Sequence, residues 1–260
     1  MNKHLLPLAL LAALPLVASA ADDNGWSGTG EVGFAAARGN AKSENLNAKL
    51  QFKKEDDQWK HNFYLTALRA KGEAKTPRID ENGAVVLDPN GGIVYDKAYE
   101  LNANRYEVGA SSGYKLDERS YIVGAARYEN DDFSPFDYQA IVSIGYGYTL
   151  LKNASNELSF EVGPGYKRYK PVDGSSEGEV VGRGLVAYKH NFTETTSFVN
   201  TLLVEAGSDN TFAQNDAGLQ VDINAKLALK VGYQIRRNSE VAPGTKKTDQ
   251  LMTTNLVYNF

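Results

Sequence analysis

The sequence predicts an all-β protein, a transmembrane antiparallel up-and-down β-barrel of about twelve strands. Apolar and polar residues alternate at every second position along most of the chain after residue 20, as in strands with two different faces. Very short connections alternate with mostly longer ones, which is typical of barrels with tight periplasmic turns and longer extracellular loops. The final strand pattern ends on an aromatic residue, Phe260.

The first twenty residues have the pattern of a secretory signal peptide. Lys3 stands in a short basic start, an apolar run ends at Val17, and the small residues Ala18 and Ala20 form an A-x-A cleavage site. The apolar run is too short to cross a bilayer as a helix. We therefore expect residues 1–20 to be removed on export and residues 21–260 to form one barrel domain.

Composition excludes several classes of protein. The chain contains no cysteine, so neither disulfides nor a lipid-modified cysteine can contribute. Its formal net charge of −4 gives no support for nucleic-acid binding. No phosphate-binding glycine loop stands outside the strand patterns, and we expect no cofactor.

Alternation defines each predicted strand. In "NLNAKLQFK", Leu46, Ala48, Leu50 and Phe52 share one face and polar residues share the other. Most runs reach the 9–11 residues that a tilted transmembrane strand needs. The predicted strands are residues 26–38, 43–54, 58–71, 98–116, 120–130, 137–151, 157–169, 178–190, 195–206, 216–223, 226–237 and 247–260.

The connections fall into two alternating sets. Five very short turns are expected at the periplasmic end, around residues 55–57, 117–119, 152–156, 191–194 and 224–225. The other set is expected at the extracellular end, at residues 39–42, 72–97, 131–136, 170–177, 207–215 and 238–246. The long extracellular loop 72–97 contains "VVLDPNGGIVY", which predicts a hairpin.

The C-terminal strand must pair with the first strand to close the cylinder, because an open edge in lipid leaves backbone groups without hydrogen-bond partners. Leu256, Tyr258 and Phe260 lie on the apolar face of this strand. They resemble the C-terminal signature by which bacterial outer-membrane proteins are recognised, so we predict an assembly signal that is read by the barrel assembly machinery.

Aromatic residues near strand ends fall on the apolar face, as in the girdles of membrane barrels. The predicted girdle residues are Trp26, Tyr106, Tyr114, Tyr138, Tyr148, Tyr188, Phe198, Tyr233 and Tyr258.

The opposite face carries charges of both signs, which would cost about 2–4 kcal/mol per Lys or Arg on a lipid face. The predicted lumen residues are Glu31, Lys49, Lys53, Lys60, Arg105, Glu107, Arg127, Glu129, Glu161, Lys167, Arg183, Lys189, Glu205, Asp222, Lys230 and Arg236. They form either an ion-paired filling or a lining that selects solutes. The mixed signs favour the filling, because selective pores usually bias one sign.

The sequence predicts no catalytic or metal site. Of the histidines that remain after signal removal, His61 and His190 both adjoin periplasmic turns, whereas hydrolysis of lipid A or of surface proteins needs a site at the outer leaflet or in the loops. Asp131, Asp132 and Asp137 make the outer loops acidic but lack the D-x-D-x-D-G spacing of a calcium loop.

Residues 25–67, "GWSGTGEVGFAAARGNAKSENLNAKLQFKKEDDQWKHNFYLTA", resemble the opening of the salt-induced outer-membrane protein family. The shared features are a "W-S-G-x-G-E-x-G" strand, a Gly-Asn turn, a "L-N-x-x-L" strand and a "W-x-H" strand. The resemblance implies an outer-membrane barrel associated with osmotic or salt conditions and supplies no catalytic residues. The 72–97 insertion is longer than the family pattern leads us to expect.

The predicted function is that of a non-enzymatic barrel in the cell outer membrane, acting in envelope or osmotic adaptation, with a narrow channel for ions or small solutes as the first hypothesis. The second is a structural or surface-binding barrel whose acidic loops meet lipopolysaccharide, cations or a partner. An outer-membrane hydrolase is the third. A soluble periplasmic barrel or sandwich, with its polar face outward, is the rival fold.

Overall fold

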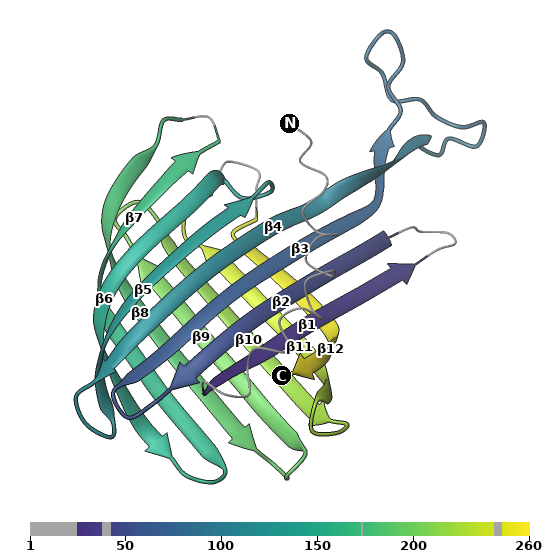
Figure 1. Ribbon diagram of the computed structural model, residues 1–260. Coiled ribbons are helices and arrows are strands. Elements are labelled where there is room, and N and C mark those ends of the chain that lie inside the picture. The colour runs from purple at the N-terminus through teal and green to yellow at the C-terminus, as the bar shows by residue number, and fades with distance from the viewer. Residues whose placement is uncertain (1–24, 38–42, 173, 242–245) are drawn as a thin grey trace.

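The computed structural model describes residues 25–37, 43–172, 174–241 and 246–260, which form a closed antiparallel barrel (Figure 1). Each strand pairs with its neighbours in sequence, and the last pairs with the first. The strands are β1 (Trp26–Ala37), β2 (Ser43–Glu55), β3 (Trp59–Pro77), β4 (Tyr95–Lys115), β5 (Ser120–Asp131), β6 (Phe136–Lys152), β7 (Asn156–Pro171), β8 (Glu177–Asn191), β9 (Thr196–Ala206), β10 (Thr211–Asp222), β11 (Leu227–Asn238) and β12 (Thr248–Asn259).

The barrel of twelve predicted strands is confirmed, with notable differences in bounds at β10 and where β3 ends and β4 begins. β10 begins at Thr211 rather than at residue 216, so the connection before it is shorter than expected. The start of β10 was predicted wrongly because the apolar Phe212 points into the lumen and the polar Asn215 points outward. Elsewhere in the barrel, apolar residues mostly face outward and polar residues inward. The signal peptide and the 39–42 turn lie outside the described residues. Among the described residues, no helix has the length and apolarity needed to cross a bilayer.

The two faces of the wall have opposite character. Large apolar side chains are exposed on the outside, with Val180 at 73% and Met252 at 72% exposure. Charged side chains are buried inside, with Glu205 at 0% and Glu129 at 2% exposure. This is the polarity of a barrel that faces lipid and the reverse of the soluble alternative.

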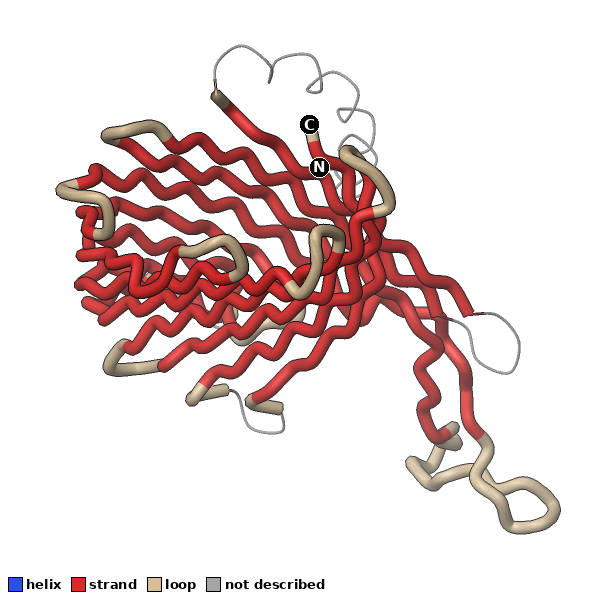
Figure 2. Tube along the Cα trace, turned by 90° about the horizontal axis from the view of Figure 1, so that it is seen from below, coloured by secondary structure: helices blue, strands red, loops and turns tan. Residues whose placement is uncertain are grey.

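β3 and β4 continue beyond their other partners and form a two-stranded ribbon that projects from the rim (Figures 1 and 2). The β2 pairing ends at Gly72 and the β5 pairing at Arg105, whereas β3 and β4 pair as far as Pro77 and Tyr95. The connection that was expected at 72–97 is therefore shortened to 78–94.

The tip of this ribbon contains two successive turns instead of the single hairpin that was expected. In the first, Asp80 Oδ1 accepts the N–H groups of residues 82 and 84, each at 2.9 Å. In the second, Asp88 Oδ1 accepts the N–H groups of residues 90 and 92, each at 2.8 Å. Gly83 and Gly91 occupy the same position in each turn with φ of 82°, a conformation that favours glycine. The two turns are copies of one local structure.

The seam between β1 and β12 closes the barrel through a short ladder. Its register runs from Thr29–Asn259 to Val32–Leu256, and backbone hydrogen bonds join Gly28 to Phe260 in both directions. The Phe260 ring lies over Gly28, where a Cβ atom would approach ring carbon Cε2 to 2.1 Å. The terminal aromatic residue therefore packs on the first strand where a side chain would not fit.

The five short turns lie at one end of the barrel, here called the periplasmic end after the expected orientation, and the other end is called extracellular. All five turns use the same capping contact. One side-chain oxygen at the first turn position accepts the N–H groups two and three residues later, as in Asx- and ST-turns. The capping residues are Asp56, Asp117, Asn153, Thr193 and Asn224.

The two aspartates should make these turns sensitive to acid. The N–H groups of Trp59 and Gln58 lower the pKa of Asp56, and those of Arg119 and Ser120 lower the pKa of Asp117. Because each pKa is lower in the folded chain, the stabilisation is complete above the ordinary carboxyl pKa and is lost as the pH falls through the lowered value.

We expect the unfolding midpoint of an Asp56→Asn/Asp117→Asn variant to fall less than that of the wild type between pH 7 and about pH 3, since asparagine caps two of the other turns without titrating. Urea unfolding followed on semi-native gels measures this. An Asn153→Asp/Asn224→Asp variant should show the opposite change. Parallel pH curves for all three proteins would mean that the caps do not contribute.

Candidate functional site

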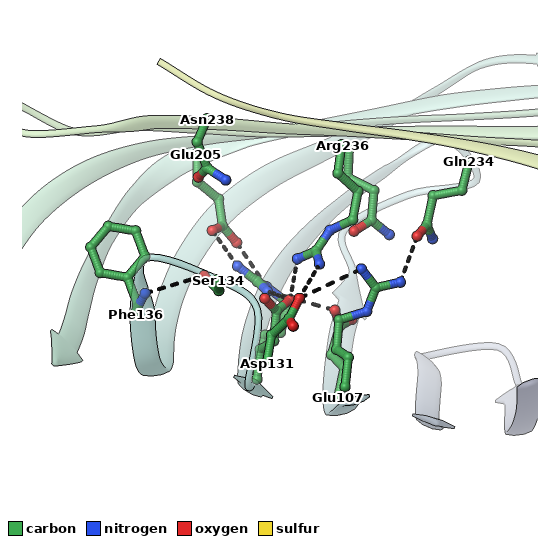
Figure 3. A network of polar contacts seen from close by, with 12 residues as sticks. Glu107, Asp131, Ser134, Phe136, Glu205, Gln234, Arg236 and Asn238 are labelled. Carbon is green, nitrogen blue, oxygen red and sulfur yellow. Dashed lines mark hydrogen bonds and ion pairs between the residues drawn. The ribbon is translucent and has the colours of Figure 1, made fainter. Parts of the chain in front are cut away.

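Four buried charged side chains form a network inside the extracellular half of the lumen, here called the central network: Arg127, Glu129, Glu205 and Arg236 (Figure 3). Arg127 donates two hydrogen bonds to Glu205, from Nε at 3.1 Å and from Nη2 at 2.5 Å, and one from Nη1 to Glu129 at 3.0 Å. Arg236 Nη2 donates to the same Glu129 oxygen at 2.5 Å.

The central network joins opposite walls of the barrel. Glu129 lies on β5 and Arg236 on β11, and these strands are six positions apart in the closed ring of strands. All four side chains are nearly inaccessible to solvent. The lumen is therefore filled with protein atoms at this level.

Glu107 on β4 extends the central network toward β3. Its Oε2 atom lies 3.6 Å from Arg127 Nη1, and its Oε1 atom accepts a hydrogen bond from Tyr64 at 2.7 Å. The Tyr64 ring occupies the space that a Cβ atom at Gly109 would need. A lumen-facing glycine thus makes room for the aromatic ring that holds Glu107.

A second chain of contacts also crosses the lumen. Arg105 Nη2 donates to Gln234 Oε1 at 2.6 Å, and Gln234 donates to Asp216 Oδ1 at 2.6 Å. Asp131 lies 3.3 Å from Arg236 and 4.0 Å from Arg105. Guanidinium groups and carboxylates alternate along these contacts, so most of the buried charges have a partner of opposite sign.

Phe212 is an apolar residue in this site, and the alternation of apolar and polar residues did not predict that it faces the lumen. Its ring is 1% exposed and lies 5.1 Å from the guanidinium carbon of Arg127 and 5.0 Å from that of Arg236. Both separations are within the range of cation–π attraction. Phe212 was expected in an extracellular loop, and its spacing from the polar residues that follow was the only signal of its inward position.

Lys167 on β7 is buried just inside the extracellular rim. Its ammonium group lies 3.9 Å from Glu179, 5.4 Å from the Phe136 ring and 5.2 Å from the Tyr169 ring. Neither Lys167 Nζ nor Glu179 Oε1 has a hydrogen-bond partner among the described residues. This pair is held more loosely than the central network.

In the periplasmic half of the lumen, two further ion pairs line the wall. Lys230 donates to both oxygens of Glu31, at 2.9 and 3.1 Å, and Arg183 donates to Glu161 at 2.9 Å. Tyr121 also donates to Glu161, at 3.1 Å.

The remaining predicted lumen residues lie nearer the periplasmic turns. Asp222 accepts a hydrogen bond from Gln220 at 2.9 Å. Lys49, Lys53 and Lys189 share the inward parity, and none forms an ion pair with a described carboxylate within 4.0 Å.

The outer surface carries the predicted aromatic residues in two groups. Near the periplasmic turns, Tyr114 meets Trp59 at a centroid distance of 5.1 Å and Tyr148 meets Phe160 at 5.9 Å. Near the extracellular end, a row of three tyrosines is built from Tyr106, Tyr128 and Tyr138. These groups have the positions of interfacial girdles.

Both histidines belong to the periplasmic aromatic surface and not to the lumen. His61 stacks on Trp59 at 5.7 Å and contacts Ser112 Oγ at 2.9 Å. His190 stacks on Tyr188 at 6.4 Å and contacts Asn156 Oδ1 at 2.8 Å. Neither histidine is part of the central network.

One polar pair on the outer face departs from the alternation of apolar and polar residues. Asn200 and Asn215 share the parity of the lipid-facing residues and exchange amide hydrogen bonds of 3.1 and 3.2 Å. Mutual pairing satisfies amides that would be costly in an apolar surrounding.

The family described as "Protein of unknown function, DUF481" matches residues 30–260. The uncharacterized protein YdiY of Escherichia coli (strain K12) is 26% identical over 235 residues, which cover 90% of this chain and 83% of YdiY.

Solved structures with a similar fold include the translocator domain of the autotransporter NalP from Neisseria meningitidis, with 12% identity, a TM-score of 0.46 and coverage of 98% of this chain and 95% of that one. The NanC porin has 9% identity, a TM-score of 0.48 and coverage of 90% and 97%. The family match spans nearly all of the barrel, as the motif at residues 25–67 predicted, and the chain belongs to the DUF481 family.

Proposed function

We propose that this protein is an outer-membrane β-barrel with a narrow channel that the central network closes at rest. The contact that carries the proposal is the hydrogen bond between Arg236 and Glu129, which joins β11 to β5 across the lumen. The apolar outer face, the two aromatic groups and the inward charges support a location in a membrane. The family resemblance supports a role in envelope adaptation to osmotic or salt conditions.

The strength of the central network explains why the channel rests closed. A bidentate arginine–carboxylate pair is among the stronger hydrogen-bonded contacts, and burial protects it from screening by salt. Opening therefore requires that the contacts between guanidinium and carboxylate groups break, and that water or permeating ions take the place of the lost partners. Such a channel conducts rarely and in small steps.

Conductance in planar lipid bilayers tests this proposal. We expect the wild type to give infrequent, small steps, and an Arg236→Ala variant to give larger and more frequent steps, because the substitution removes the side chain that crosses from β11. An Arg237→Ala variant is the matched control, since Arg237 is the adjacent arginine on the opposite, outward face of β11.

Two outcomes would contradict the proposal. Absence of conductance in both the wild type and the Arg236→Ala variant, with both barrels folded, would favour a purely structural or surface-binding role. Recovery of the protein outside the outer-membrane fraction would contradict the location.

A further inference from the structure

The periplasmic half of the lumen contains lysines that form no ion pair within 4.0 Å with any carboxylate of the described residues. Lys49 and Lys53 lie on β2 and Lys189 on β8, all on the inward parity. Two of the acids nearby are already engaged, Glu31 by Lys230 and Glu161 by Arg183. The charges that balance one another in the central network are thus not balanced here.

These lysines face one another across the barrel. β2 and β8 are six positions apart in the ring of strands, and Lys53 lies within electrostatic reach of Lys49, Lys189 and Lys230. Glu157 on β7 is paired in register with Lys189 on β8 and is the carboxylate within electrostatic reach of Lys53. Glu157 and Asp222 are the two carboxylates of this half that form no ion pair with a described residue within 4.0 Å, and they are outnumbered by the lysines. The local excess of positive charge attracts anions.

Lys60 on β3 adds to this excess. Its ammonium group lies 4.0 Å from the centroid of the Tyr121 ring, and among the described residues it has no ion pair within 4.0 Å. Neutral donors lie close by, since the amide of Gln51 donates to Asn62 at 2.6 Å on the strand that pairs with β2. The lining therefore combines ammonium and amide groups, both of which bind oxyanions.

The lysine end of the lumen is accessible to solvent, whereas the level of the central network is buried. The side chains of Lys53, Lys189 and Glu157 are exposed to solvent, although they lie on the inward parity. Toward the extracellular end, the lumen is filled by the central network. Solvent therefore reaches these side chains from the end of the barrel beside the five capped turns, and this end of the lumen is here called the vestibule.

We propose that this vestibule binds a small soluble anion with two or more negative charges, such as a phosphorylated or polycarboxylated solute, which enters from the periplasm. The assignment of the open end to the periplasm rests on the proposed outer-membrane location, whereas the binding itself does not. Several ammonium groups from opposite walls favour a multiply charged ligand, because one such anion can contact more than one lysine. A lipid headgroup is kept out at this level, where the seam between β1 and β12 is paired from Gly28 to Val32.

Isothermal titration of the detergent-refolded mature protein with pyrophosphate at low salt tests the site. We expect saturable binding that weakens as salt is added, and a loss of affinity of about tenfold or more in a Lys49→Gln/Lys53→Gln/Lys189→Gln variant. The matched control is Lys75→Gln/Lys226→Gln/Lys246→Gln, which removes the same charge from exposed residues outside the lumen and should bind as the wild type does. Spermidine, a polycation, should not bind.

Absence of saturable binding to the wild type, or an equal loss in both triple variants, would overturn the inference.

A separate experiment tests which end is open and keeps this question apart from the outer-membrane proposal. In a chain without cysteine, Lys189→Cys supplies a single thiol. We expect a bulky maleimide to label it in spheroplasts but not in intact cells, and pyrophosphate to slow the labelling. Labelling of intact cells would contradict entry from the periplasm.

Discussion

Replacing Arg127 by methionine is expected to destabilise the barrel by about 3–5 kcal/mol, the largest effect of any single substitution in the lumen. Methionine has a similar length, so little volume is lost and the effect is mainly electrostatic. Glu205 is fully buried and loses both hydrogen bonds of its bidentate pair, and Glu129 loses one of its two arginine partners. A buried carboxylate without a partner carries a high desolvation penalty.

Urea unfolding in detergent, followed by the fraction of the fast-migrating folded band, measures this change. An Arg127→Met/Glu205→Met double variant should recover much of the lost stability, because removing both members of a buried pair is far less costly than removing one. Arg127→Lys should fall between these, since it keeps the charge but loses the bidentate geometry. Wild-type stability in all three variants would show that the central network does not hold the walls together.

Gly28→Val is expected to prevent closure of the barrel. The Phe260 ring occupies the place of the new side chain, and the seam has too few ladder pairs to tolerate its displacement. Overpacking of this kind typically costs about 1–3 kcal/mol, and here the cost falls on the interaction that joins the first and last strands. We expect little or no fast-migrating folded band for this variant on a semi-native gel.

Two further variants separate a steric defect from a general one. Gly28→Val/Phe260→Ala should recover part of the folded band, because the clash is removed even though the terminal aromatic residue is lost. Gly124→Ala is the control, since no atom lies within 4 Å of a Cβ placed there. A Gly28→Val barrel that folds like the wild type would contradict this role of Phe260. Failure of the double variant would instead show that the Phe260 ring itself is required, as expected of an assembly signal.

The strands were predictable from sequence because their alternation and their turns are local signals. The capping residues of the periplasmic turns, for example Asp56 and Asn224, stand at the start of each short connection. Parity also indicated that Arg127 and Arg236 share the inward face. It did not indicate that both meet Glu129, since contacts across the lumen depend on the register and shear of the whole barrel.

The failures of prediction also have local causes. Phe212 faces the lumen and Asn215 faces outward, the opposite of the usual pattern, so the alternation did not indicate a strand at the start of β10. Beyond Gly72 the chain reads "EAKTP", with polar residues on both faces, because a ribbon in water on both sides needs no apolar face. Alternation reports contact with lipid or with a core, and it disappears where a strand has neither.

The ribbon of β3 and β4 also has a mechanical consequence. The ladder between these strands shifts register between Ala70 and Lys71, just where the neighbouring strand β2 ends its pairing at Gly72. A bulge bends and twists a strand locally, and here it coincides with the last lateral support. We therefore expect the projecting part to bend relative to the barrel wall at Ala70–Lys71, at the rim.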